Sequence, residues 1–199
     1  LCVSVLKAGQ PVPGDAALVI IPGSKSTRRD FAFLKDQGWD VDLKAHLRRG
    51  GHVLGICGGY QMLGKTINDP EGLEGPVGCS DGLGFLDVDT LMTQNKSLTR
   101  VTACYGADKL DINGYEIHIG RTEGTDCARP FAHVEGRPEG AQNLNGQIKG
   151  VLMHFKWVAG VPKRHQKDIK TTPKVRWSLD NLCPSWRFWA QKARPKQFL

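Results

Sequence analysis

The chain has 199 residues, 40% of them hydrophobic and 24% charged, which suits one domain with a buried core. No apolar run approaches the roughly 18 residues of a membrane helix, and the start lacks the pattern of an export signal, so we expect a cytoplasmic protein. The six cysteines are scattered without a C-x-x-C pair, which argues against a disulfide framework and against a zinc site.

The net charge of +7 is unevenly distributed along the chain. Residues 1–155 carry 16 Lys and Arg against 18 Asp and Glu, whereas residues 156–199 carry 11 against 2. The second stretch also holds four of the five tryptophans. We therefore predict a main domain over residues 1–155 and a basic, Trp-rich tail over residues 156–199.

The first predicted elements are apolar strands followed by a helix. Residues 17–21 have the β-branched composition of a strand, and residues 1–6 are a second candidate. A helix is predicted over residues 28–37, with Phe31 and Leu34 on its buried face.

A second helix is predicted from about residue 40 to Gly50. Its buried face is expected to carry Val41, Ala45 and Leu47, and it leads into an apolar strand at residues 53–56. Two strand, helix, strand passages in a row indicate a largely parallel sheet, whose sites lie at the carboxyl ends of the strands.

A sharp turn is predicted where that strand meets a helix starting near Tyr60, and Cys57 stands on it in a G-x-C-x-G pattern. Gly55 and Gly59 suit such an elbow because they tolerate strained backbone and close neighbours. The thiol would face the positive end of the helix, which favours thiolate, and the N–H of Gly58 would be free to hold an oxyanion. The alternative is a buried structural cysteine of an α/β core.

The turn after the first strand, residues 23–27, invites comparison with a phosphate loop. A Walker loop needs glycine directly before its lysine and another glycine five positions earlier, where this chain has Ser24 and Val19. We reject that interpretation and expect Gly23 and Ser24 to supply a second set of backbone N–H groups beside the elbow.

The middle of the chain predicts a loop and further strands. Residues 69–82 are rich in Gly and Pro, whereas residues 83–92 and 98–104 alternate as strands do. These strands are expected to be antiparallel in part.

A strand within residues 114–124 carries Glu116 and His118 on one face. The pair either lines a site or belongs to a solvated face. A metal site formed with Cys57 lacks a third spaced ligand, so we expect no metal.

A last strand is predicted over residues 148–153, with His154 at its end. A histidine there is either structural or the base that takes the proton of the cysteine thiol.

Several stretches together resemble the glutamine amidotransferase domain of the CobB/CobQ type, the branch of class I amidotransferases that includes cobyric acid synthase. The match runs in order across roughly residues 11–154 and is more specific than any single piece. Its pieces are Pro13-Gly14-Asp15, residues 18–27, Gly50-Gly51, residues 55–61, residues 114–118, residues 120–124 and residues 150–154.

The resemblance implies a flavodoxin-like α/β fold, an open and largely parallel, mixed sheet with helices on both faces. It implies that Cys57 attacks the side-chain amide of L-glutamine and that His154 protonates the departing ammonia. The oxyanion hole would be formed by backbone N–H groups of Gly23, Ser24 and Gly58. Residues carried over only as tentative substrate contacts are Gly59, Tyr60, Gln61, Tyr115, Glu116 and His118.

The resemblance also implies a partner. Ammonia would pass to a synthetase domain that uses ATP and Mg²⁺ to amidate the carboxylates of a corrinoid in cobalamin biosynthesis, and no cofactor is expected in the amidotransferase domain itself. That synthetase domain, and the opening strand and helix of the amidotransferase domain, are expected to be missing from this chain.

Three features near the end of the chain depart from the family pattern. Phe155 stands where the family usually has Gly, Lys156 stands where many class I relatives have Glu, and residues 156–199 resemble no family ending. We interpret the tail as dispensable sequence from a shifted reading frame, and the alternative is a nucleic-acid-binding extension. For the chain as a whole, the alternative to an active amidotransferase is a catalytically inactive fragment of that enzyme.

Overall fold

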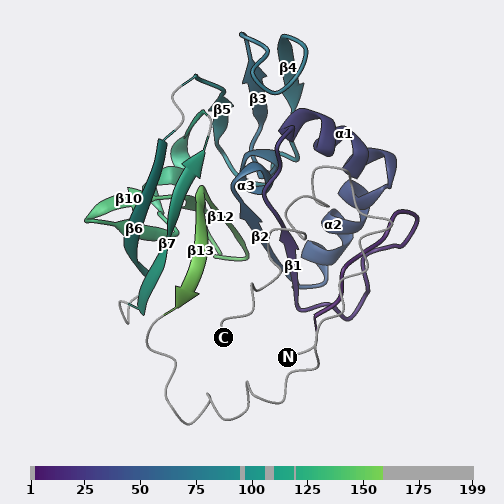
Figure 1. Ribbon diagram of the computed structural model, residues 1–199. Coiled ribbons are helices and arrows are strands. Elements are labelled where there is room, and N and C mark those ends of the chain that lie inside the picture. The colour runs from purple at the N-terminus through teal and green to yellow at the C-terminus, as the bar shows by residue number, and fades with distance from the viewer. Residues whose placement is uncertain (1–2, 95–96, 106–109, 119, 159–199) are drawn as a thin grey trace, which may run out of the picture.

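A four-stranded, largely parallel sheet forms the centre of the molecule (Figure 1). The computed structural model describes residues 3–94, 97–105, 110–118 and 120–158. The strands of the central sheet, in spatial order, are β1 Leu18–Ile21, β2 His52–Ile56, β12 Ile148–Val151 and β11 Ala141–Gln142. The first three are parallel and β11 is antiparallel, so the prediction of a largely parallel, mixed sheet is confirmed.

Three helices pack on one face of this sheet. They are α1 Thr27–Asp36, α2 Trp39–Arg48 and α3 Gly58–Leu63. Val19, Val53 and Ile148 share a face because they are aligned in register, and they pack with the helices in one hydrophobic core. No helix of the described residues is long and apolar enough to cross a membrane.

The opposite face of the central sheet is covered by strands rather than by helices. Ile56 and Val151 on that face pack against a second core formed with a five-stranded sheet. Leu18 and Ile20 of β1, also on that face, are 49% and 50% exposed. Among the described residues, helices are therefore found on one face of the sheet, which differs from the expectation of helices on both.

Two further sheets complete the described structure. The five-stranded sheet contains β10 Arg137–Glu139, β9 Ala132–Val134, β6 Ser97–Tyr105, β7 Leu110–His118 and β13 Met153–Val158. The smaller sheet contains β4 Gly78–Asp81, β3 Thr66–Asp69, β5 Asp89–Leu91 and β8 Arg121–Glu123, and the 3₁₀ helix η1 Thr125–Ala128 follows β8.

Some predicted elements are wrong in position or kind. Residues 3–6 form no strand, and the strand expected over residues 83–92 is reduced to β5. The stretch expected to be a loop contains β4, which pairs with β3 from Asp69↔Gly78 to Thr66↔Asp81. A Gly- and Pro-rich composition predicts turns but does not report pairing with a distant strand.

The buried face of α2 also differs from the prediction. Val41 is 60% exposed, whereas Trp39, Leu43 and His46 are buried. The helical period is as expected, but the face that meets the sheet is rotated away from Val41.

Candidate active site

The sharp turn between β2 and α3 places Cys57 at the carboxyl end of a central strand. Cys57 has φ 52° and ψ −114°, a strained conformation for a residue with a side chain. Its N–H donates to the carbonyl oxygen of Val151 at 2.8 Å, which ties the turn to β12. The predicted sharp turn between strand and helix, residues 55–59, is therefore present.

Close backbone packing explains the glycines of the elbow. A Cβ on Gly55 would lie 2.6 Å from the carbonyl oxygen of Gly59, and a Cβ on Gly59 would lie 2.0 Å from the carbonyl oxygen of Ile21. Both distances are shorter than carbon and oxygen can approach. The elbow can form only because both positions lack a side chain.

The turn after β1 lies directly beside the elbow, as predicted. A Cβ on Gly58 would lie 2.9 Å from the backbone nitrogen of Ser24, so these two backbone segments are neighbours. The Ser24 hydroxyl donates to the Asp30 carboxylate and accepts the N–H of Ser26 at 2.9 Å. This side chain therefore fixes the turn and leaves the backbone to face the elbow.

The Cys57 thiol is not activated in the way that the sequence predicted. Burial raises the pKa of the thiol from its ordinary value of 9.0 to about 11, the N–H of Gly58 lowers it, and the nearby charge of Glu74 raises it further. The expectation that the start of α3 favours thiolate is therefore wrong, because desolvation outweighs the short helix. A thiol with this pKa needs a base before it can react near neutral pH.

Glu74 is a site residue that the sequence analysis missed. Its carboxylate accepts the N–H of Thr27 at 2.6 Å, at the start of α1, and lies close enough to Cys57 to raise the pKa of the thiol. Burial raises the pKa of Glu74 itself, and Thr27 partly offsets that shift. Asp69 holds the Glu74 loop by accepting the N–H groups of Leu73 and Glu74 at 2.8 and 3.1 Å.

Gly59, Tyr60 and Gln61, which were predicted as tentative substrate contacts, are all in contact with other parts of the protein. Gly59 packs on Ile21, Gln61 accepts a hydrogen bond from the Thr27 hydroxyl at 3.2 Å, and the Tyr60 ring lies against β12. All three are buried. These contacts indicate packing, and direct contact of the three residues with substrate stays a prediction.

His154 comes from a strand that leaves the central sheet. The predicted strand over residues 148–153 ends at Val151, and after Leu152 the chain continues as β13 in the five-stranded sheet. His154 is the second residue of β13 and pairs in register with Tyr115 of β7. The histidine is therefore inside a strand near the sheet junction, not at a strand end; its side chain lies outside the described residues.

The other predicted residues of β7 have only a backbone position. Glu116 is aligned with Met153, and His118 with Ser97 of β6. Their side chains, like that of Tyr115, lie outside the described residues, so their role stays a prediction. Within the part of the chain that the structure describes, no group of three or more His, Cys, Asp and Glu could hold a metal ion.

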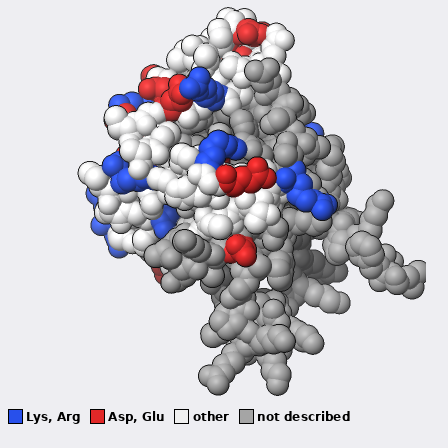
Figure 2. All heavy atoms as spheres, turned by 90° about the vertical axis from the view of Figure 1, so that its left-hand side faces the viewer, with Lys and Arg blue, Asp and Glu red and all other residues white. Residues whose placement is uncertain are grey.

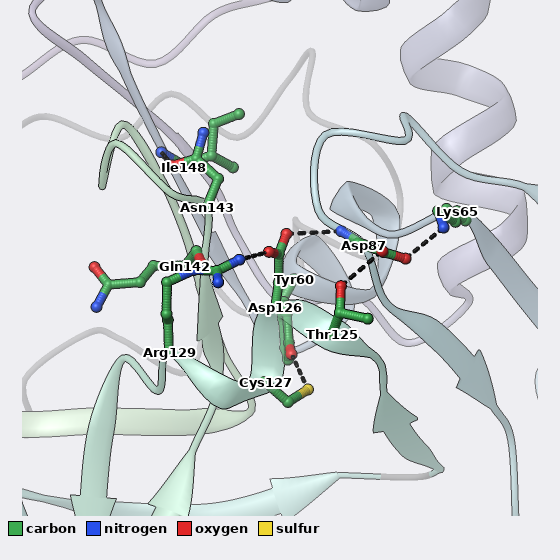
Figure 3. A network of polar contacts seen from close by, with 10 residues as sticks. All are labelled: Tyr60, Lys65, Asp87, Thr125, Asp126, Cys127, Arg129, Gln142, Asn143 and Ile148. Atoms are coloured by element: carbon green, nitrogen blue, oxygen red, sulfur yellow. Dashed lines mark hydrogen bonds and ion pairs between the residues drawn. The ribbon is translucent and has the colours of Figure 1, made fainter.

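A network of polar contacts centres on Asp126 of η1 (Figure 3). Asp126 of η1 accepts the N–H of Asp87 at 2.8 Å and forms an ion pair with Arg129. Asp87 in turn pairs with Lys65 and accepts the Thr125 hydroxyl at 2.6 Å. We call these five residues the polar network.

The network reaches the central sheet through the loop that starts at β11. Arg129 Nε donates to the carbonyl oxygen of Gln142 at 3.2 Å, and the next residue, Asn143, accepts the N–H of Ile148 at 3.1 Å (Figure 3). Ile148 begins β12, so the network holds the start of the strand that leads toward His154.

The surface beyond the network carries charges of both signs. In Figure 2, Lys and Arg lie next to Asp and Glu on the visible face of the described residues. The described residues include the ion pairs Arg121–Glu123 and Arg137–Glu139. The predicted alternative of nucleic acid binding rests on the basic tail, and residues 159–199 lie outside the described residues.

Comparison with protein families identifies the domain. A family model described as CobB/CobQ-like glutamine amidotransferase domain matches residues 3–160. The chain belongs to this family. The elbow with Cys57 and the consecutive strands β12 and β13, the second of which carries His154, lie within the matched residues of this amidotransferase domain.

The amidotransferase domain is similar to part of larger proteins. It is 63% identical over 150 residues to a cobyric acid synthase from Rhodobacter capsulatus, covering 75% of this chain and 31% of that protein. It is 63% identical over 151 residues to one from Jannaschia sp., covering 76% and 31%, and 48% identical over 187 residues to one from Ruegeria sp., covering 90% and 39%. The chain thus spans about a third of the length of these relatives.

Solved structures share the fold at low sequence identity. The structure of PurLQS from Thermotoga maritima matches with a TM-score of 0.53 and 18% identity, over 73% of this chain and 71% of that one. A crystal structure of a glutamine amidotransferase matches with a TM-score of 0.50 and 15% identity, over 69% and 70%. These matches confirm the α/β amidotransferase fold.

Proposed function

We propose that this domain hydrolyses L-glutamine to glutamate and ammonia through a covalent intermediate on Cys57. The observation that carries the proposal is the elbow: a cysteine at positive φ, at the end of a parallel strand, beside the Gly58 and Ser24 backbone. Such a turn exposes a nucleophile next to N–H groups that can stabilise a tetrahedral oxyanion.

The chemistry requires a base because the thiol is protonated near neutral pH. We assign this role to His154, which takes the Cys57 proton as the sulfur bonds to the amide carbon. His154 then donates that proton to the nitrogen as the C–N bond breaks and ammonia leaves. Water attacks the remaining thioester and releases glutamate, which restores the thiol.

The position of Glu74 supports glutamine as the substrate. Glutamine carries an α-ammonium group, and a half-buried carboxylate close to Cys57 is a suitable partner for it. Asp69 accepts the backbone N–H of Glu74, and the N–H of Thr27 donates to the Glu74 carboxylate, so both hold the residue in place. We assign Glu74 to recognition of the α-ammonium group, with Cys57 acting at the other end of the substrate.

The ammonia is proposed to serve a synthetase domain. The relatives named cobyric acid synthase are about three times as long as the matched region, which leaves room for an ATP-dependent domain. By this proposal the whole enzyme amidates corrinoid carboxylates in cobalamin biosynthesis. ATP and Mg²⁺ would bind in that domain.

The test is an ammonia-release assay with the remaining part of a relative supplied. Replacing Cys57 by Ala should lower glutamine-dependent ammonia release by at least about 1000-fold, because by this proposal the thioester forms on the Cys57 sulfur. Cys79→Ala is the matched control, since this exposed cysteine lies away from the elbow on β4. Equal ammonia release from the chain and from Cys57→Ala would remove the proposal.

The choice of acceptor needs a second measurement. In the same mixture, ATP-dependent amidation of a corrinoid carboxylate with glutamine as nitrogen donor should depend on Cys57, whereas amidation with free ammonium should not. Amidation from glutamine that persists in Cys57→Ala would separate this domain from the synthetase reaction.

A further inference from the structure

The ring of Tyr60 fills a space that exists because residue 150 is glycine. A Cβ on Gly150 would lie 1.9 Å from Tyr60 Cδ2 and 2.6 Å from Cγ. Tyr60 is 1% exposed, and the atoms in question are near the root of a rigid ring. The contact therefore fixes how closely α3 lies on β12.

The contact between Tyr60 and Gly150 links the two parts of the proposed site, the elbow with Cys57 and the segment that leads to His154. Tyr60 lies three residues after Cys57, on the helix that the elbow opens. Gly150 precedes Val151, whose carbonyl oxygen accepts the Cys57 N–H at 2.8 Å. From Val151 the chain passes through Leu152 alone into β13, which carries His154.

Other contacts within the protein hold the Tyr60 ring and the end of β12 in place. The Tyr60 hydroxyl lies 3.8 Å from Cys127 Sγ, at hydrogen-bond distance for sulfur. The N–H of Leu152 donates to Glu139 Oε1 at 2.9 Å, and Glu139 is 5% exposed. The ring is thus held at its tip and β12 at its end, so neither is free to move away from an added methyl group.

We propose that Tyr60 and Gly150 are positioning residues that set the separation between the Cys57 thiol and the His154 imidazole. The proposal rests on the proposed function, since it assumes that these two side chains exchange a proton. Tyr60 acts here through the strand it contacts, and it needs no contact with glutamine.

Four variants of the full chain test the contact. Gly150→Ala adds the colliding methyl group, and Gly14→Ala is the matched control, because an added Cβ there meets nothing within 4 Å. The double variant Gly150→Ala with Tyr60→Met is the rescue: methionine is unbranched and can bend around the new methyl group. His154→Ala supplies the reference for a site without its base.

The measurement is the rate at which iodoacetamide alkylates Cys57 between pH 6 and 10, followed for that peptide by mass spectrometry. Alkylation reports the fraction of thiolate, which a base beside the thiol increases near neutral pH. We expect His154→Ala and Gly150→Ala each to slow the reaction at pH 7 by about 10-fold or more, with profiles shifted to higher pH. Gly14→Ala should match the unchanged chain, and the double variant should return to within about threefold of it.

Each other outcome overturns the proposal in a recognisable way. Faster alkylation in Gly150→Ala means that the fold has opened and that the contact is only structural. An unchanged rate in Gly150→Ala, with a slowed rate in His154→Ala, removes the positioning role and leaves the Cys–His pair. An unchanged rate in His154→Ala removes the pair itself, and with it both the proposed mechanism and this inference.

Discussion

The elbow and the polar network are two regions that the fold holds together by different means. At the elbow, backbone meets backbone, and a Cβ on Gly59 would lie only 2.0 Å from Ile21 O. In the polar network, Asp126 is 7% exposed and is satisfied by an N–H and a guanidinium from other parts of the chain. The elbow requires residues that lack a Cβ, whereas the polar network requires side chains that form hydrogen bonds and an ion pair. They should therefore fail under opposite kinds of mutation.

The largest effect is expected from adding one methyl group at the elbow. Gly59→Ala places a Cβ against a carbonyl oxygen of β1 that cannot move without separating β1 from β2. We expect a loss of about 3 kcal/mol or more in the free energy of unfolding, measured by urea denaturation. Gly14→Ala, where the added atom meets nothing, should be nearly neutral. Equal stabilities for the two variants would show that the elbow is not sterically limited.

A loss of similar kind but smaller size is expected from removing atoms in the polar network. Asp126→Ala leaves the Asp87 N–H without its acceptor and breaks the ion pair with Arg129. Because Arg129 is partly exposed, we expect a loss of about 2 kcal/mol in the free energy of unfolding. Asp126→Asn keeps an acceptor and loses the charge, so it should fall between Ala and the unchanged chain. An order with Asn below Ala would contradict this account of the network.

The pH dependence of stability tests the burial of the Cys57 thiol. Its pKa is higher in the folded chain than the ordinary value of 9.0, so the folded state binds the proton more tightly. This stabilisation is complete below pH 9 and is lost as the pH rises toward about 11, by about 2 kcal/mol. Unfolding curves at pH 8 and pH 10.5 should show a steeper loss for the unchanged chain than for Cys57→Ser, which does not titrate there. An equal loss of unfolding free energy in the two proteins would show that the Cys57 thiol is exposed to solvent and has an ordinary pKa.

The sequence predicts the elbow well because the signal is local. Strand, turn and helix follow one another within residues 53–63, and the glycines around Cys57 are needed by contacts with near neighbours. The parallel pairing of β1 and β2 can also be predicted from the sequence, because helices separate the two apolar runs that form these strands. The thiolate was predicted wrongly because desolvation depends on what packs over the sulfur, and that is not local.

The rest of the site depends on contacts between distant segments. Glu74 reaches the site from a loop that follows β3, and nothing near it in sequence marks it as a neighbour of Cys57. The change of sheet at Leu152 has no composition signal, because residues 148–153 read as one apolar strand. Whether His154 faces Cys57 stays a prediction, and the alkylation profile of His154→Ala decides it.

The smallest effect is expected at the exposed edge of the polar network. Lys65 and Asp87 form an ion pair whose side chains are 55% and 43% exposed, so water competes for both charges. Lys65→Ala should leave the urea midpoint unchanged within error, although it removes an ion pair from the same network that Asp126→Ala disrupts. Asp87 keeps the Thr125 hydroxyl, and its N–H keeps Asp126, so the buried part of the network stays satisfied. A loss in Lys65→Ala as large as in Asp126→Ala would mean that the network acts as one cooperative unit, and the contrast between its buried and exposed contacts would then disappear.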